Sequence, residues 1–275
     1  YSFESVPRVD ARLVPSRFDG AEDYTLEVNS RGVVTRAGGV AGLFYARQTL
    51  DQMTSDGTIK ELRCCTIEDG PRFPYRGLHV DVSRHFRSVD FLKKQMDAMA
   101  LFKMNRMHLH LTDAAGWRLE IDAYPRLTDF AAWRPQPTWK EWWKGDRKYV
   151  EMGSEGAYGG YYTKEDIAEL VSYAAARHIE LIPEIEMPSH SEEVLAAYPE
   201  LGCTGEPYKD SDFCVGNEAV FTFLETVLTE VMGMFPSEYI HIGGDEAGKE
   251  HWKTCPKCQQ RMADENISDV DGLQS

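Results

Sequence analysis

The sequence lacks several features that would place it at once in a class of protein. No apolar run approaches the roughly 18 residues of a membrane-spanning helix. Its 30 lysines and arginines form no basic block and are outnumbered by 45 aspartates and glutamates, which gives a formal net charge of -15. Because nucleic-acid binding needs a basic face, we expect no nucleic-acid partner and no membrane span, and a partner that is neutral or weakly charged.

The N-terminal stretch YSFESVPRVDARLV also lacks an initiator methionine and the apolar core of a signal peptide. We interpret this end of the chain as processed or cut, so it leaves the cellular location open. The composition is that of an ordinary globular protein, with 42% hydrophobic and 27% charged residues. A length of 275 residues suits one large domain, or one domain with a small companion.

Cysteine is scarce, and only one pair has suggestive spacing. Cys255 and Cys258 are spaced like half a zinc ribbon or a redox pair. A structural zinc site needs a second such pair or nearby histidines, and none follows this pair in the sequence. We therefore favour free or locally paired thiols over metal binding, and we expect no metal and no cofactor. The remaining cysteines are Cys64, Cys65, Cys203 and Cys214.

From about Arg76 onward, the sequence repeats a short apolar strand, a polar loop and an amphipathic helix. Strands are predicted at 77–82, 106–111, 179–185 and 239–244, and helices at 88–104, 163–178, 217–235 and about 249–265. We expect Ser88 to cap the first helix, and Thr163 with Asp166 to form a capping box at the second. This alternation implies parallel strands joined by crossovers, as in half of an eight-stranded barrel or a short doubly wound sheet.

The N-terminal quarter has a different pattern. Residues 22–38 alternate like two paired strands around the turn-forming tetrapeptide NSRG, and residues 40–53 have the pattern of a helix. We predict a small α+β domain over residues 1–70 and a β/α domain over residues 71–275.

Polar side chains gather after each strand predicted in the β/α domain. They are Arg84 and His85, then His110 and Asp113, then Glu184, Glu186 and His190, and finally Asp245 and Glu246. The strands of a parallel barrel all point the same way, so these side chains are expected to meet at the C-terminal rim, where barrel enzymes carry their active sites. Four such clusters in succession favour the barrel and predict a functional site.

The acidic pair in YIHIGGDE is the most informative of these clusters. At a strand end, neighbouring side chains point in opposite directions, so Asp245 and Glu246 are expected to address different parts of a ligand. Adjacent carboxylates repel, which favours one staying protonated at neutral pH. A protonated acid beside an ionised one suits the cleavage of a glycoside. An acidic pair is usually solvated surface, but this position at a rim favours a functional role.

The sequence also resembles a known family. The blocks YRGLHVDVSRHF, HLHLTDAAGWRLEI, GGYYTKEDI, IPEIEMPSHS and YIHIGGDE are similar, in order and spacing, to those of the family 20 glycoside hydrolases, the β-N-acetylhexosaminidases. The resemblance implies a (β/α)8 TIM-barrel-type catalytic domain, of which the first four units or so are present, after the small domain. Its later strands, which supply further sugar-binding residues in the family, cannot be assigned, so we expect the barrel to be incomplete at its C-terminal side.

The resemblance also implies an activity. It indicates removal of terminal non-reducing β-linked N-acetylglucosamine or N-acetylgalactosamine, with retention, through an oxazolinium ion formed by the substrate's own acetamido group. The implied partner is an oligosaccharide or glycoconjugate that contains N-acetylhexosamine. An extracellular, periplasmic or lysosome-like compartment is favoured over the cytoplasm, and the oligomeric state stays open.

Roles for individual residues follow from the same match. Glu246 corresponds to the general acid, which then serves as the base that activates water, and Asp245 to the residue that holds the acetamido N–H. Arg84 resembles the arginine that grips sugar hydroxyls, and Asp113 and His190 resemble a dyad that supports the acid.

Other residues have more than one possible place in this scheme. His110, Glu184 and His241 are expected to line the pocket or brace it, with a structural role equally open. The aromatic-rich stretch 133–162 shapes a leaving-group subsite or packs a long loop, and we weigh the two equally. Two positions depart from the family pattern: Ala114 stands where a second aspartate is often found, and Ser189 where glycine is common.

Two alternatives remain for the site. In the first, a metal-dependent barrel hydrolase, His108 and His110 on one strand face would bind a metal ion together with His190 and Asp245. In the second, the protein is an inactive or carbohydrate-binding fragment of a hexosaminidase.

Overall fold

The computed structural model describes residues 8–54 and 62–275. The chain divides into two compact units. The first takes in the chain up to Leu78 together with Lys93–Arg106 and Tyr173–Glu180, and the second comprises His79–Leu92, Met107–Ser172 and Leu181–Ser275. The first half of the N-terminal stretch considered above lies outside the described residues. The boundary between two domains near residue 70 stays a prediction.

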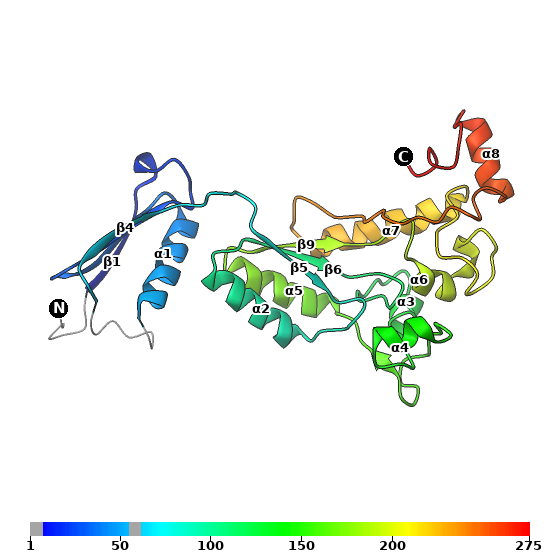
Figure 1. Cartoon of the computed structure of the whole chain (residues 1–275), viewed down its shortest axis with the longest axis horizontal. Helices are drawn as coiled ribbons and strands as arrows, with labels where there is room; N and C mark the ends of the chain where they lie inside the picture. Colours follow the sequence, from blue (N-terminus) through cyan, green and yellow to red (C-terminus); the bar gives the residue numbers. More distant parts are fainter. Residues whose placement is uncertain (1–7, 55–61) are drawn as a thin grey trace. The chain divides into compact units, whose positions relative to one another are not determined.

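A four-stranded sheet opens the first unit, in the order β1-β3-β2-β4 (Figure 1). Its strands are β1 (Arg8–Leu13), β2 (Tyr24–Asn29), β3 (Gly32–Ala37) and β4 (Cys65–Asp69). Strands β2 and β3 form the expected antiparallel hairpin, and the side chain of Asn29 accepts a hydrogen bond from the backbone N–H of Arg31 in its turn. Gly32 closes that turn with a φ of 141°, which favours glycine.

Helix α1 (Val40–Met53) has the bounds predicted from the sequence and packs against this sheet. The core of this part of the unit contains Leu26 and Val28 from β2 with Tyr45 and Leu50 from α1, all at most 2% exposed. The period-2 pattern of the strands and the helical pattern of α1 therefore meet in one core.

A parallel sheet follows, with strands β5 (Gly77–Asp81), β6 (Arg106–His110) and β9 (Glu180–Glu184) in that order. Its direction follows from backbone hydrogen bonds at both ends of the strands. The N–H groups of Asn105 and Arg106 donate to the carbonyl of Arg76, and further along the N–H of Val82 donates to the carbonyl of His110. Helix α2 (Val89–Leu101) connects β5 to β6, and α5 (Lys164–Ala175) lies between β6 and β9. The predicted alternation of strands and helices is confirmed for these elements.

Both predicted helix caps are present. The side chain of Ser88 accepts the backbone N–H of Phe91 at the start of α2. At the start of α5 the N–H of Asp166 donates to the Thr163 hydroxyl, and the N–H of Thr163 donates to the Asp166 carboxylate. These bonds satisfy N–H groups that have no partner inside the helix.

The predicted fourth strand at 239–244 is wrong as a regular strand. Residue His241 makes a single parallel bridge to Glu184, supported by bonds such as the one from the N–H of Ile185 to the carbonyl of His241. Directly afterwards the N–H of Gly243 donates to the ring of His241, and Gly243 takes a φ of 63°. This turn ends the extended backbone before a ladder can form.

The C-terminal helices are α7 (Glu218–Met234), close to its predicted bounds, and α8 (Pro256–Asp264), which is shorter than predicted. Pro256 explains the later start of α8, because proline fits the first turn of a helix but not its interior. Shorter elements were not predicted: η1 (Pro15–Arg17), α3 (Arg126–Asp129), β7 (Trp133–Arg134), α4 (Trp139–Lys144), β8 (Tyr158–Gly159), α6 (Glu192–Ala197) and η2 (Pro199–Leu201).

Among the residues that the structure describes, no helix has the length and apolar character needed to cross a bilayer.

Candidate active site

Arg84 and Asp113 meet where β5 and β6 end. Nη2 of Arg84 lies 2.7 Å from Oδ2 of Asp113, and its Nη1 lies 2.9 Å from Nε2 of His110 and 3.2 Å from Oδ2 of Asp81. The hydroxyl of Ser83 ties the two loops together by donating to the carbonyls of Asp113 and Gly116. The loops after two neighbouring strands therefore hold one arginine against one buried carboxylate.

Two buried arginines brace these loops, and sequence reasoning missed both. Arg118 is fully buried and donates only to backbone carbonyls, including those of Val82 and Ser83. Arg134, also buried, donates to the carbonyl of Arg84 at 2.9 Å. Arginine is mostly found at the surface, so the sequence carries no signal for this burial.

Beneath the rim, Glu184 gathers three of the expected histidines. Its Oε2 lies 2.7 Å from Nε2 of His108 and 2.7 Å from Nδ1 of His110, and its Oε1 lies 3.0 Å from Nδ1 of His241. Burial by itself raises the pKa of Glu184, but hydrogen bonds from His108 and His110 outweigh it and lower that pKa far below its usual range. The carboxylate is thus held in its charged form.

His110 responds in the opposite sense. Burial lowers the pKa of His110, but its hydrogen bonds to Asp113 and Glu184 outweigh burial and raise the pKa to about 10. A protonated imidazole bridging two carboxylates is the consistent state of this trio. His110 connects the Arg84–Asp113 pair with the Glu184 cluster.

His190 connects the same network to the acidic pair. Its Nδ1 lies 3.9 Å from Oδ1 of Asp113, while its Nε2 lies 3.3 Å from Oε2 of Glu246 and 3.7 Å from Oδ2 of Asp245. The structure therefore brings all eight predicted site residues into one connected set. They are Arg84, His110, Asp113, Glu184, His190, His241, Asp245 and Glu246. His85 lies apart from this set, with its Nδ1 2.7 Å from the hydroxyl of Tyr158.

The expectation that Asp245 and Glu246 point in opposite directions is wrong, since both carboxylates reach the same nitrogen of His190. The alternation of a strand is broken because Gly243, Gly244 and Glu246 all have positive φ angles, of 63°, 104° and 55°. A positive φ is strained for a residue with a side chain, and such strain clusters at functional sites. The two side chains are largely exposed, at 69% for Asp245 and 78% for Glu246.

Glu186 is a site residue that the sequence analysis placed at the rim but assigned no role. It is buried, one oxygen accepts the N–H of Gly244 at 2.9 Å, and the other has no hydrogen-bond partner among the described residues. Burial, with a smaller contribution from the charges of Asp245 and Glu184, raises its pKa to about 7 against the effect of Gly244. The signal available in the sequence was its position two residues after Glu184 in an extended segment.

The geometry does not assemble the metal site considered above. His108 and His110 do share a strand face, but both turn to Glu184, whereas His190 groups with Asp245 and Glu246. Within the described ranges 8–54 and 62–275, no group of potential metal ligands combines these two histidines with His190 and Asp245.

The aromatic residues of the stretch 133–162 fall into two groups: some pack the loop, and others are exposed and could form a leaving-group subsite. Trp142, Tyr149 and Tyr162 are buried, and Trp142 donates to the carbonyl of Lys148, so these rings pack the loop. Trp139 and Trp143 are instead exposed and stacked, with ring centroids 5.5 Å apart. This exposed pair could offer a ring face to a sugar, although Arg147 lies over the Trp143 ring at 4.3 Å from its centroid.

Comparison with known proteins identifies the family. The model "Glycosyl hydrolase family 20, catalytic domain" matches residues 73–275, and "Glycosyl hydrolase family 20, domain 2" matches residues 5–70. The chain belongs to glycosyl hydrolase family 20. Its catalytic domain is of the TIM-barrel type, with a small domain before it, and the three parallel β/α units described above are part of that barrel.

Two curated relatives are β-hexosaminidases. The protein from Porphyromonas gingivalis is 40% identical over 270 residues, which cover 92% of this chain and 33% of the relative. The protein from Akkermansia muciniphila is 39% identical over 248 residues, which cover 86% of this chain and 48% of the relative. The chain thus spans between a third and a half of the length of these relatives.

Solved structures agree with this placement. The β-N-acetylhexosaminidase from Bacteroides fragilis matches with a TM-score of 0.82 and 34% identity, over 97% of this chain and 50% of that one. An exo-β-N-acetylglucosaminidase from Vibrio harveyi, in complex with N-acetylglucosamine, matches with a TM-score of 0.83 and 32% identity, over 96% of this chain and 42% of that one.

Proposed function

We propose that this protein is a β-N-acetylhexosaminidase that releases terminal non-reducing β-linked N-acetylglucosamine or N-acetylgalactosamine, with retention, by a substrate-assisted mechanism. The observation that carries the proposal is the Asp245–Glu246 pair beside His190, in a chain that belongs to family 20. The relatives named above as β-hexosaminidases support the same substrate class.

Glu246 and Asp245 divide the work in this proposal. Glu246 protonates the glycosidic oxygen as it leaves, and later takes a proton from the water that opens the oxazolinium ring. Asp245 holds the N–H of the 2-acetamido group, so that its carbonyl oxygen attacks the anomeric carbon, and stabilises the positive charge that develops. Both carboxylates lie near Nε2 of His190, at 3.7 Å for Asp245 and 3.3 Å for Glu246, so this ring can help to position the pair.

The buried residues behind the pair position it. Asp113 lies near His190 on one side and holds Arg84 on the other, so the arginine's remaining N–H groups can donate to sugar hydroxyls. His110 and Glu184 lie behind Arg84 and Asp113 as a charged pair, because each is stabilised in its ionised form by the other. His241 braces Glu184 from the opposite side.

One observation favours a second candidate, the binding of sugar without turnover. A general acid needs a raised pKa, which enzymes achieve by burying the carboxyl group. Glu246 is 78% exposed in this chain. Arg84, Asp113 and the exposed tryptophans Trp139 and Trp143 would still recognise a sugar in such a protein.

Hydrolysis of a chromogenic β-N-acetylglucosaminide separates the two functions. The protein is expected to turn the substrate over, and Glu246→Gln to lower kcat/KM, by more for a poor leaving group than for an activated one; Glu250→Gln, a change at an exposed carboxylate nearby, is expected to leave it unchanged. Calorimetry with N-acetylglucosamine is run alongside. Binding by a folded protein without turnover would favour the second candidate, and a Glu246→Gln variant with full activity would contradict the first.

A further inference from the structure

Four cysteines from segments far apart in the sequence meet in the second unit. Cys203 and Cys214 lie between η2 and α7, and Cys255 and Cys258 lie at the start of α8. The four sulfur atoms all lie within 4.8 Å of one another. We propose that this four-cysteine cluster binds one zinc ion through four thiolates and serves as a structural site.

The spacing of the sulfur atoms matches a metal site. The Sγ atoms of Cys203 and Cys258 are 3.8 Å apart, those of Cys214 and Cys255 are 3.6 Å apart, and those of Cys214 and Cys258 are 3.8 Å apart. Four thiolates placed tetrahedrally around zinc, at Zn–S distances of about 2.3 Å, are separated by about 3.8 Å. A disulfide would bring two sulfurs to about 2.05 Å.

The pattern of neighbours also argues against two disulfides. The Cys214 sulfur lies near those of both Cys255 and Cys258, and the Cys258 sulfur lies near those of both Cys203 and Cys214. Disulfides pair each cysteine with one partner, whereas ligands around a metal ion neighbour all the others. Thiolate sets with tetrahedral geometry select zinc or an iron–sulfur cluster among common metals, and a single zinc ion needs no sulfide or iron supply.

Burial and backbone geometry fit a closed structural site. Cys214 and Cys258 are fully buried and Cys255 is 6% exposed. The backbone N–H of Gly216 donates to the sulfur of Cys258, the kind of second contact that orients a thiolate ligand. A site with four protein ligands and little access for water has no open position for a substrate, so its role is structural.

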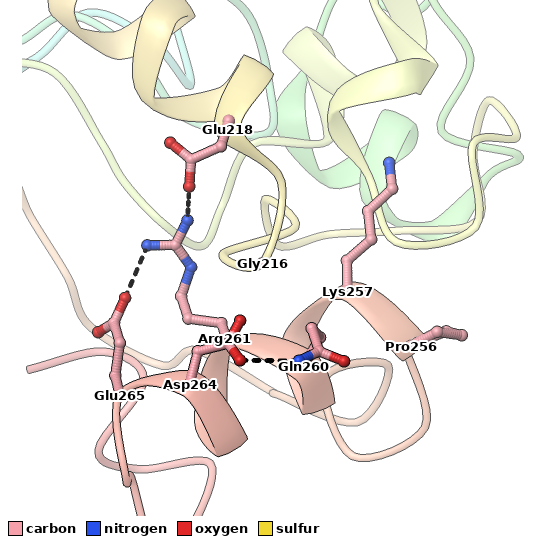
Figure 2. Close-up of a pocket in the computed structure, with 8 residues that line it drawn as sticks. All are labelled: Gly216, Glu218, Pro256, Lys257, Gln260, Arg261, Asp264 and Glu265. Atoms are coloured by element: carbon pink, nitrogen blue, oxygen red, sulfur yellow. Dashed lines mark hydrogen bonds and ion pairs between the residues drawn. The ribbon is translucent and has the colours of Figure 1, made fainter.

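Gly216 shows how closely the two segments approach. A Cβ atom at this position would lie 2.2 Å from the carbonyl carbon of Lys257 and 2.3 Å from the backbone nitrogen of Cys258. Figure 2 shows Gly216 beside the start of α8, with Arg261 reaching from α8 to Glu218 at the start of α7. Only glycine permits this approach, which brings the backbone before α7 against the cysteine pair of α8.

No second cysteine pair follows Cys255 and Cys258 in the sequence, so free or locally paired thiols were the expectation there. The structure supplies that second pair from upstream: Cys214 and Cys203 lie 41 residues before Cys255 and 55 residues before Cys258, respectively. Because Cys203 and Cys214 are eleven residues apart rather than three, they have no recognisable zinc-ribbon spacing.

The position of the four-cysteine cluster indicates which segments a bound zinc ion would hold in place. The N–H of Lys249 donates to the Asp212 carboxylate, the indole N–H of Trp252 donates to the carbonyl of Phe213, and His251 pairs with Asp210. Residues 210–213 therefore hold residues 249–252, which begin three positions after Glu246 in the sequence. A zinc ion at the four-cysteine cluster fixes both of these segments at one end.

The proposal is tested by measuring metal in the protein purified under reducing conditions without added metal. We expect one zinc ion per chain by plasma mass spectrometry, retained on dialysis. Cobalt(II) exchanged into the site is expected to show thiolate-to-cobalt charge-transfer absorption and the visible bands of tetrahedral cobalt. Cys203→Ser, at the least buried ligand, is expected to lose the zinc, and Cys64→Ser/Cys65→Ser, outside the cluster, to retain it.

The wild-type measurement decides the matter even if the Cys203 variant does not fold. Folded, reduced protein that holds no zinc, even after incubation with equimolar Zn²⁺, would overturn the proposal. So would peptide mapping that shows disulfides among the four cysteines of freshly purified protein, or iron and inorganic sulfide in place of zinc. None of these readouts depends on turnover, so the proposed glycosidase function and the zinc site can fail independently.

Discussion

Nε2 of His190 lies 3.3 Å from Oε2 of Glu246. The other ring nitrogen of His190 faces Asp113, which in turn contacts Arg84 and His110. An exposed carboxylate is thereby connected to a buried set of charges through a single imidazole. The placement of Glu246 in the proposed mechanism is therefore expected to depend on Asp113 and His110, to which that mechanism gives no contact with substrate.

The proposed division of roles predicts that changes at Glu246 and Asp245 respond differently to the leaving group. Glu246→Gln removes the proton donor, and activated aryl leaving groups need little protonation. Its loss in kcat/KM is expected to be about 10²- to 10⁴-fold for an alkyl or sugar leaving group and much smaller for a dinitrophenyl one. Asp245→Asn is expected to lose activity to a similar degree with every leaving group. Steady-state kinetics over a series of β-N-acetylglucosaminides measures both.

The reverse pattern would assign the acid to Asp245, and equal losses at both positions would contradict the division of roles. Glu250→Gln serves as the matched control, because Glu250 is an exposed carboxylate paired with Lys253.

Glu186 predicts a stability that depends on pH. Burial raises its pKa from 4.5 to about 7 in the folded protein. A folded-state pKa above the unfolded one means that the contribution to stability is fully present below pH 4.5 and is lost as pH rises through 7. Glu186→Gln cannot ionise, so its free energy of unfolding relative to wild type is expected to increase by up to about 3 kcal/mol between pH 4.5 and 8.

Urea denaturation at several pH values measures this difference. The exposed Glu250→Gln control is expected to follow wild type throughout. A Glu186→Gln variant whose stability runs parallel to wild type across this range would show that Glu186 ionises normally.

The sequence was a good guide wherever the determinants are local. The bounds of α1 and the caps at Ser88 and Thr163 were predicted correctly, because apolar spacing and capping residues act within one or two turns. The sequence also predicted that the residues after the strand ends lie close together, since this depends only on the strands running in parallel. The strand expected at 239–244 failed because a ladder needs successive paired residues, and Gly243 turns the backbone away after one bridge.

Long-range relationships had no signal that a single sequence could carry. The burial of Arg118 depends on carbonyl groups from several distant loops. The approach of Cys203 and Cys214 to the pair on α8 depends on how the chain packs around Gly216. Exposed Asp245 and Glu246 were identified by their motif, whereas the two contacts that place them beside His190 had to come from the structure.

The His110–Glu184 pair predicts a loss of stability at alkaline pH. The folded-state pKa of His110 is raised from 6.5 to about 10, so its contribution is fully present below pH 6.5 and is lost as pH rises through 10. The pKa of Glu184 is lowered, so its contribution is present above its unfolded value of 4.5 and is lost as pH falls through the folded value. Together they favour the folded state most between pH 4.5 and 6.5.

His110→Gln leaves Glu184 and Asp113 without the positive charge between them. The variant is expected to lose about 3–5 kcal/mol at pH 6, as when one partner of a buried ion pair is removed, and much less near pH 10, where the wild-type imidazole is losing its proton. Guanidinium denaturation at pH 6 and pH 9.5 measures the gap, which is the difference in free energy of unfolding between wild type and His110→Gln. His178→Gln, outside this network, is the control. A gap that does not narrow with rising pH would mean that His110 is neutral in the folded protein.

The contacts of Arg118 predict that the loops of the site depend on this one buried side chain for their stability. Its guanidinium donates to five backbone carbonyls, those of Val82, Ser83, Ala115, Ala132 and Gly160. Arg118→Lys keeps the charge but offers three donors in a different geometry, so at least two buried carbonyls lose their partners at about 1–3 kcal/mol each. The variant is expected to be less stable by about 3 kcal/mol or more, whereas Arg126→Lys, at a guanidinium 46% exposed, should change stability by less than about 1 kcal/mol. Chemical denaturation at pH 7 compares the two, and equal losses would show that water replaces the missing donors and that the loops hold themselves.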